Sequence, residues 1–369
     1  MYPVLRNPRG SLMRKCDSDQ QALAVGRVYH FYVDETAATN GDGTESSPWN
    51  NINSVFDVSG FSNAELIFLT CYADPCARVI VHVEGPVNRI IDPGAAGVQH
   101  YKKKLTFVPW RNERVIVNPD TPLNTAVPEE MYIVRARGFN FVGFDFVFHP
   151  HFNTPLQLAD SITCIQCYRQ GTDLFDCTID MYVDASATAS SMYFIHGRSN
   201  DAVFGDIKIE NSSLSLGSEV DSTLTAHFYG VSQESLGAIK IINSTIDAVM
   251  HINELTMHHY IRVYAVFTNP SQTTLILIDN STISVSTGFQ TYNLPVPPTA
   301  GSYIIVGCAV RAREGFYFVV DSELSVGYCF AKEYVRVLGD WVLRDQAGVC
   351  SGSDPNSWYY PPSCIIGVS

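Results

Sequence analysis

Residues 239–246 read IKIINSTI, and the same pattern recurs along the chain. In each copy a small or polar turn residue follows two alternating apolar positions, and a third apolar position comes three residues later. The turn residues are Gly143, Asp176, Asn211, Asn243, Asn280, Asp321 and Asp340. Their flanking positions are all apolar, which is improbable by chance in a chain that is 46% hydrophobic. A repeat of this kind indicates a solenoid.

Each copy has the alternation of a β-strand with one buried face, as in residues 207–210, which read IKIE. Asn and Asp suit the bend that follows, because they tolerate left-handed backbone angles. One strand–bend–strand unit cannot bury its own apolar face, whereas stacked units can. The repeats are spaced unevenly, by roughly 19 to 41 residues, which we attribute to loops of variable length. The chain is therefore predicted to be an all-β solenoid.

A distinctive segment precedes the repeats. A strand at Phe31–Asp34 is followed by the Gly-rich loop NGDGT at 40–44, by SPW at 47–49, and by a short apolar helix pattern at 52–56. This order resembles the opening of right-handed parallel β-helix proteins of the pectin-lyase-like superfamily. The resemblance implies a single-stranded right-handed parallel β-helix whose first coil is covered by a short N-terminal capping helix. A cap is physically needed there, because the end coil otherwise leaves an open core.

The Asn-Ser-Thr-Ile copies at Asn243–Ile246 and Asn280–Ile283 resemble the inward asparagine ladder of that family. The resemblance implies that Asn211, Asn243 and Asn280 form a structural ladder, with each side chain pointing inward and hydrogen-bonded to the neighbouring coil. The same residues begin Asn-Ser-Ser or Asn-Ser-Thr, which match the N-glycosylation sequon. Because we expect these asparagines to be buried, we predict that they carry no glycan.

Three segments follow from the extent of the repeat: an N-terminal arm at 1–28, the capped parallel β-helix at 29–345 and a C-terminal tail at 346–369. Ordering a free arm costs roughly 1–2 kcal/mol per residue. We therefore expect both arms to pack on the solenoid ends or on other protein subunits. The apolar anchors would be Tyr2, Val4 and Leu5 at one end, and Trp358, Tyr359 and Tyr360 at the other.

The charge and hydropathy of the chain exclude several partners. A formal net charge of −13 makes nucleic acid an improbable partner, because binding its backbone needs a basic face. No apolar stretch approaches the 18 to 20 residues of a membrane span. Residues 1–10 lack the apolar core of a secretory signal, so we expect a virion or an intracellular assembly rather than secretion.

The cysteine spacing gives little support to a metal site. Cys164 and Cys167 form a lone CxxC on an expected strand, with no second pair at zinc-finger spacing. Alternation would turn Cys164 inward and Cys167 outward. We favour reduced thiols that act as small hydrophobic side chains, and we predict no metal and no cofactor.

The resemblance to pectin-lyase-like proteins also implies which catalytic patterns to seek, and this chain departs from them. Their hydrolases carry Asn-x-Asp, Asp-Asp, Gly-His-Gly and Arg-x-Lys on consecutive coils. Here His196-Gly197 lacks the preceding Gly, and Arg262-Val263-Tyr264 lacks the Lys. We therefore name no catalytic residue and lean against an enzyme.

One constellation could still bind a ligand. His196 lies about 15 residues before its turn residue, and His227 and Tyr264 each lie about 16 before theirs. Stacking would bring these three side chains onto neighbouring coils, together with Arg198 and Arg262. Such a groove could bind a glycan or act as a general acid–base site. Ordinary surface and edge residues are the competing interpretation.

Three functions remain open. The leading one is a non-enzymatic structural protein, a rigid component of a larger assembly. Its preferred form is a minor capsid or surface protein of a virion, followed by a cytoskeletal or ciliary scaffold. The second is a glycan-binding spike module. The third is a polysaccharide lyase or glycoside hydrolase of the pectin-lyase-like type.

Overall fold

The structure is a computed structural model of the 369-residue chain. It describes residues 5–6, 12–13, 28–56, 78–93, 105–111, 114–119, 130–136, 138–149, 158–168, 171–183, 188–198, 205–220, 227–234, 237–252, 260–268, 274–289, 304–311, 315–329, 332–337 and 340–345.

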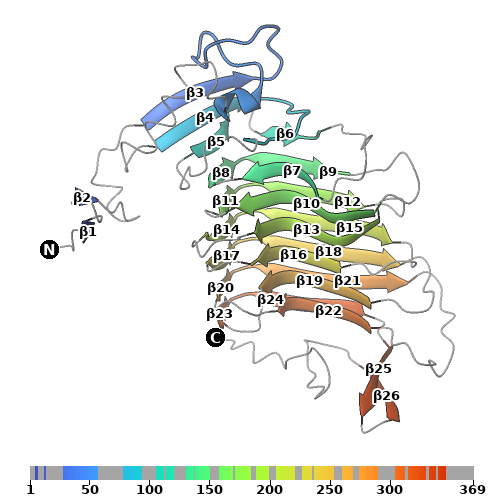
Figure 1. The fold of residues 1–369 in the computed structure, drawn as a ribbon. Helices are drawn as coiled ribbons and strands as arrows, with labels where there is room; N and C mark the ends of the chain where they lie inside the picture. Colours follow the sequence, from blue (N-terminus) through green and yellow to red (C-terminus); the bar gives the residue numbers. More distant parts are fainter. Residues whose placement is uncertain are drawn as a thin grey trace.

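The chain forms a parallel β-helix whose coils are stacked along one axis (Figure 1). All strand pairings within its three sheets are parallel. The nine-stranded sheet contains β3 (Val28–Asp34), β4 (Arg78–Glu84), β5 (Leu105–Pro109), β8 (Phe139–Val142), β11 (Thr172–Phe175), β14 (Ile207–Glu210), β17 (Ala238–Ile242), β20 (Thr274–Asp279) and β23 (Gly315–Val320).

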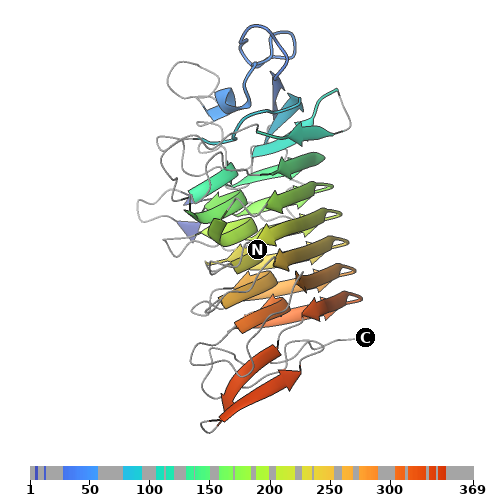
Figure 2. The same ribbon diagram turned by 90° about the vertical axis from the view of Figure 1, so that its right-hand side faces the viewer.

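The other two sheets complete the coils from β5 to β20, as the turned view shows (Figure 2). The seven-stranded sheet contains β6 (Val115–Val117), β9 (Phe144–Phe148), β12 (Thr178–Val183), β15 (Ser213–Val220), β18 (Thr245–Ile252), β21 (Thr282–Phe289) and β24 (Glu323–Cys329). The six-stranded sheet contains β7 (Glu130–Ala136), β10 (Leu158–Tyr168), β13 (Thr188–Arg198), β16 (His227–Gln233), β19 (Tyr260–Thr268) and β22 (Ile304–Arg311).

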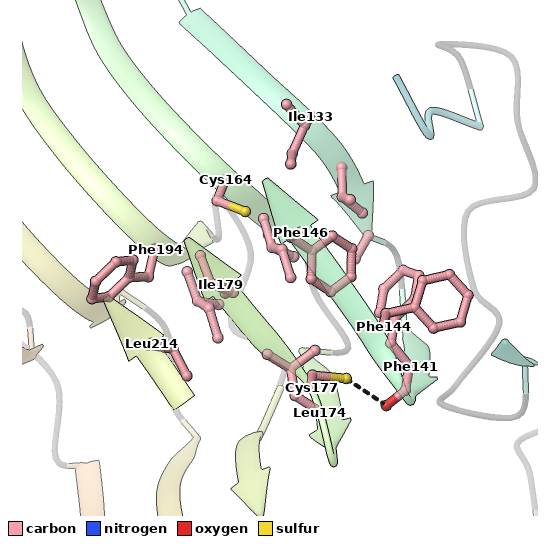
Figure 3. Packing of buried hydrophobic residues seen from close by; sticks show 14 of the residues in the cluster. Ile133, Phe141, Phe144, Phe146, Cys164, Leu174, Cys177, Ile179, Phe194 and Leu214 are labelled. Atoms are coloured by element: carbon pink, nitrogen blue, oxygen red, sulfur yellow. Dashed lines mark hydrogen bonds between the residues drawn. The ribbon is translucent and has the colours of Figure 1, made fainter. Parts of the chain in front are cut away.

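Apolar side chains from successive coils form columns in the core. Ile209, Ile241 and Ile278 are register partners on β14, β17 and β20, and all three are fully buried. A second column contains Leu214, Ile246 and Ile283 on β15, β18 and β21. The columns confirm the predicted stacking. Figure 3 shows the same packing in earlier coils, where Phe141, Phe144 and Phe146 fill the interior.

The bend between the nine-stranded and seven-stranded sheets has the backbone conformation that the turn residues predicted. The φ angles are positive at Gly143 (69°), Asp176 (51°), Asn211 (50°), Asn243 (48°), Asn280 (44°) and Asp321 (44°). Asn and Asp are among the few residues with a side chain that tolerate this region. The repeated turn residue therefore encodes the corner of the coil.

The buried ladder at this bend is made by serines, so the predicted inward orientation of the asparagines is wrong. The predicted hydrogen bond to the neighbouring coil is present between Asn280 Nδ2 and Asn243 Oδ1, at 2.8 Å, on the outside of the bend. Asn211, Asn243 and Asn280 are exposed, and the residue after each one is buried. The backbone N–H of Ser212 donates to Ser244 Oγ at 3.1 Å, and that of Ser244 donates to Ser281 Oγ at 3.1 Å. The left-handed turn residue causes the difference, because it reverses the in–out alternation and leaves two successive side chains outside.

Cys177 occupies the same ladder position one coil earlier. Its backbone N–H donates to Ser212 Oγ at 3.0 Å, and its thiol donates to the carbonyl oxygen of Phe141 at 3.4 Å (Figure 3). At the other end, the backbone N–H of Ser281 donates to Ser322 Oγ at 3.0 Å. Burial raises the pKa of the Cys177 thiol to about 12, so the thiol remains a neutral donor.

A 3₁₀ helix, η1 (Ile52–Phe56), packs on the first coils. Phe56 stacks on Phe139 with 5.0 Å between ring centroids, and Glu35 accepts a hydrogen bond from the backbone N–H of Ile52 at 2.6 Å. Trp49 is fully buried against Phe31. Gly43 is required here, because its φ is +82° and a Cβ would lie 2.6 Å from the Trp49 ring.

The copy at Asp340 does not form a coil, which corrects the repeat prediction. Asp340 begins β26 (Asp340–Asp345), which pairs antiparallel with β25 (Lys332–Val337) outside the three sheets. Its spacing of about 19 residues from Asp321 is too short for the three strands of a coil. In the N-terminal segment, β1 (Leu5–Arg6) and β2 (Leu12–Met13) also pair antiparallel. Tyr2, Val4 and residues 346–369 lie outside the described residues.

Candidate functional site

The residues of the predicted groove lie on neighbouring strands of the six-stranded sheet. His196 and Arg198 are on β13, His227 is on β16, and Arg262 and Tyr264 are on β19. Neighbouring strands of a sheet lie about 4.8 Å apart. The structure therefore brings these five positions onto three successive coils, as the sequence predicted.

Their register differs from the prediction. His227 lies opposite Arg262, whereas Tyr264 lies opposite Tyr229. His196 lies opposite Ser232, five residues further along the strand than His227. A single column of His196, His227 and Tyr264 is thus absent from the described strands. Counting back from the turn residues failed because the loops that follow these strands differ in length.

The strands of this sheet bend, and the bend sets which side chains point outward. Met192, Phe194 and Ile195 of β13 join the core, while Tyr193 packs outside it in a separate aromatic cluster. Two successive residues therefore point inward at this corner. On β10 the same bend buries both Cys164 and Cys167 in the core, so the expected outward Cys167 is wrong.

Tyrosines dominate the outward cluster. Tyr193 stacks on Tyr229 with ring centroids 5.4 Å apart, and Tyr229 lies 5.8 Å from Tyr264. Phe267 extends the cluster, with its ring 4.8 Å from that of Tyr229. Tyr264 is only 1% exposed, and burial raises the pKa of Tyr193 above its usual range. These rings pack on one another rather than lining an open surface.

His196 belongs to the same packed face. Its ring lies parallel to Tyr193 at 4.1 Å, and the residue is 6% exposed. The imidazole Nε2 lies 3.0 Å from a carboxylate oxygen of Glu234. The backbone N–H of Glu234 donates to the carbonyl oxygen of Gly197 at 2.8 Å. An imidazole beside a carboxylate can hold and transfer a proton. A substrate would have to reach it past tightly packed side chains.

The remaining groove residues are His227, Arg198 and Arg262. The His227 ring is partly buried and lies 5.7 Å from Tyr229. For Arg198 and Arg262 the structure describes the backbone position alone, at the ends of β13 and near the start of β19. Sequence reasoning missed Tyr193, Tyr229 and Glu234. The signal was present for the tyrosines, because Tyr193, Tyr229 and Tyr264 each follow an apolar core residue.

An exposed aromatic platform lies on the seven-stranded sheet. Tyr182 of β12 is 38% exposed, and its register partner is Gly217 of β15. A Cβ on Gly217 would lie 3.0 Å from the tyrosine ring, so the glycine lets the ring lie close to the sheet. His149 approaches edge-on at 6.0 Å, and its Nε2 lies 3.4 Å from Asp180 Oδ2. Sequence reasoning also missed this group.

A further aromatic group lies near the cap, on the outer face of the nine-stranded sheet. His30 Nδ1 is 2.9 Å from His82 Nε2, and the His82 ring stacks on Tyr32 at 4.8 Å. Tyr32 in turn lies 5.0 Å from Trp110, whose ring is covered by the Arg111 guanidinium at 3.8 Å. Burial and the neighbouring His30 lower the pKa of His82. These rings pack against one another across the first coils.

Among the described ranges, no three His, Cys, Asp or Glu side chains are arranged to hold a metal ion. Within the same part of the chain, every helix is too short or too polar to cross a bilayer.

No protein-family model, no curated protein and no solved structure matches this chain. What the structure establishes is the architecture, a parallel β-helix.

Proposed function

We propose that this chain is a non-enzymatic structural protein, the rigid β-helix component of a larger assembly. The observation that carries the proposal is the unbroken ladder through the bend. Backbone N–H groups of Cys177, Ser212, Ser244 and Ser281 each donate to the hydroxyl of the next coil. Each bond is buried or partly buried and links one coil to the next, so the coils act as a stiff rod.

The packing of the predicted groove supports the same proposal. Tyr264 and His196 are almost fully buried, and the tyrosines fill the space that a ligand would use. A net charge of −13 disfavours nucleic acid as the partner. We prefer a minor capsid or surface protein of a virion, with a cytoskeletal or ciliary scaffold as the other form. We also propose pectin-lyase-like ancestry, on the strength of the capped parallel β-helix.

The test is whether the chain is found in a stoichiometric complex. The tagged full-length chain would be isolated from its native cells or particles, and its apparent mass and copy number measured. We expect a complex much larger than the 40.8 kDa chain. Deletion of residues 1–20 should leave the β-helix folded and weaken incorporation. A monomeric chain in the native source would contradict the proposal.

A glycan-binding module is the second candidate, and the Tyr182 platform favours it. An exposed aromatic face can pack against the apolar face of a sugar ring, while Asp180 and Ser215 offer polar groups beside it. Glycan-array binding without turnover would support this function. Tyr182→Ala should then abolish binding, whereas Phe175→Ala, at an exposed ring on the nine-stranded sheet, should not.

A further inference from the structure

The outer edge of the bend presents three N-glycosylation sequons on successive coils. Asn211, Asn243 and Asn280 are exposed, each at a left-handed corner. The hydroxyl residues that complete the sequons, Ser213, Thr245 and Thr282, are exposed as well. Only the intervening serine of each sequon points inward. Both side chains that define an acceptor site therefore lie on the outside of the coil.

The left-handed corner alone does not account for an asparagine followed two residues later by a hydroxyl residue. Asp176 and Asp321 occupy the same left-handed corner in the flanking coils, with φ angles of 51° and 44°. Gly143 occupies it in an earlier coil. Asn together with a hydroxyl two residues later is confined to three central coils among these six corners.

The contact between two of the asparagines and the spacing of the coils together determine which sites can carry a glycan on one molecule. Asn280 Nδ2 donates to Asn243 Oδ1 at 2.8 Å. An amide nitrogen that carries a sugar keeps one hydrogen, so Asn280 could be glycosylated and still make this bond. Successive coils are about 4.8 Å apart, which is narrower than a sugar ring with its N-acetyl group. Alternate coils are about 10 Å apart and leave room for two glycans.

We infer that this edge is an N-glycan acceptor surface, with Asn211 and Asn280 modified on one molecule and Asn243 left between them. The glycans project from the corner, away from the three sheet faces. This inference is independent of the assembly proposal, since it rests on the exposed corner rather than on the ladder inside it.

The test uses the full-length chain, expressed behind a cleavable secretory leader in glycosylating cells. Intact mass would be measured before and after peptide N-glycosidase treatment in ¹⁸O water, which labels each formerly glycosylated asparagine. We expect a mass loss equal to two glycans, with label at Asn211 and Asn280. Thr282→Ala should remove the label at Asn280, whereas the matched Thr282→Ser should retain it. Thr282 is exposed, so circular dichroism should show both variants folded.

Two results would overturn the inference. One is an unchanged mass after glycosidase treatment, in cells where a co-expressed control glycoprotein is modified. The other is label at Asn243 together with an adjacent site on the same molecule. Either result would be compatible with an assembly role, so it would not bear on the proposed function.

Discussion

The hydroxyl of Ser244 accepts a hydrogen bond from the backbone N–H of Ser212 at 3.1 Å, and so links one coil to the next. The same hydroxyl donates to the carbonyl oxygen of Ile242 at 2.7 Å. A single side chain thus satisfies two backbone groups at the corner, one in its own coil and one in its neighbour. Buried backbone groups need such partners.

Ser244→Ala should therefore destabilise the fold. It leaves the Ser212 N–H and the Ile242 carbonyl without this partner, and we expect a loss of about 1–3 kcal/mol in the free energy of unfolding. Asn243→Gly is the matched control, because Gly143 already occupies the equivalent left-handed corner. Denaturant unfolding should show a change within about 0.5 kcal/mol for the control. Equal losses in both variants would contradict the serine ladder.

Ile241→Asp should prevent folding, because it places a carboxylate in a fully buried column between Ile209 and Ile278. An unpaired buried charge costs more than the net stability of most domains can offset. Lys240→Gln, on the outward side of the same strand, should fold normally. Far-UV circular dichroism and limited proteolysis would distinguish the two. A folded, protease-resistant Ile241→Asp protein would refute the core assignment.

The thiol of Cys177 should make stability fall at alkaline pH. Burial raises its pKa in the folded protein from 9.0 to about 12. The contribution of the neutral thiol to the stability of the fold is fully present below pH 9 and is lost as the pH rises toward 12. In that range the Cys177 thiol ionises in the unfolded chain but stays protonated in the folded one. The slope is up to about 1.4 kcal/mol per pH unit for each such thiol.

Cys177→Ser should reduce this alkaline slope and keep the ladder, since serine is the residue in the following coils. Cys164, whose pKa burial also raises, should contribute a remaining slope. Unfolding midpoints at pH 7.5 and pH 10.5 would measure the difference. An unchanged slope would show that Cys177 is not protected in the folded chain.

Tyr229→Ala should be far more damaging than Tyr182→Ala. Tyr229 lies between Tyr193 and Tyr264 in the buried cluster, and its removal should cost about 3 kcal/mol. Tyr182 is 38% exposed, so its removal should cost about 0.5 kcal/mol or less. Thermal unfolding of both variants would test the ranking. A small effect at Tyr229 would reopen the candidate groove as a binding surface.

Strand periodicity was sufficient to predict the columns through Ile209, Ile241 and Ile278, because every coil repeats the same spacing around its turn residue. It was insufficient at the corners. The left-handed backbone at Asn243 puts two successive side chains outside. The bend within the six-stranded sheet does the reverse and puts both Phe194 and Ile195 inside. Alternation counted through either corner assigns the wrong face, as happened for the asparagine ladder and for Cys167.

The register of the six-stranded sheet could not be predicted because it depends on loops. His196 pairs with Ser232 and not with His227, although both histidines lie at similar distances from their turn residues. The pattern at Asp340 also satisfied every apolar position, yet it forms an antiparallel hairpin. Local patterning specifies a strand and a bend. It does not specify the strand with which the segment pairs.

Each ladder coil offers a backbone N–H to one neighbour and a serine hydroxyl to the other. The length of this molecule can therefore change by whole coils. Duplicating a single coil would extend the axis by about 4.8 Å and present unchanged partners to both neighbours. Gene duplication or deletion of one repeat could thus set the reach of the protein without redesigning its interior.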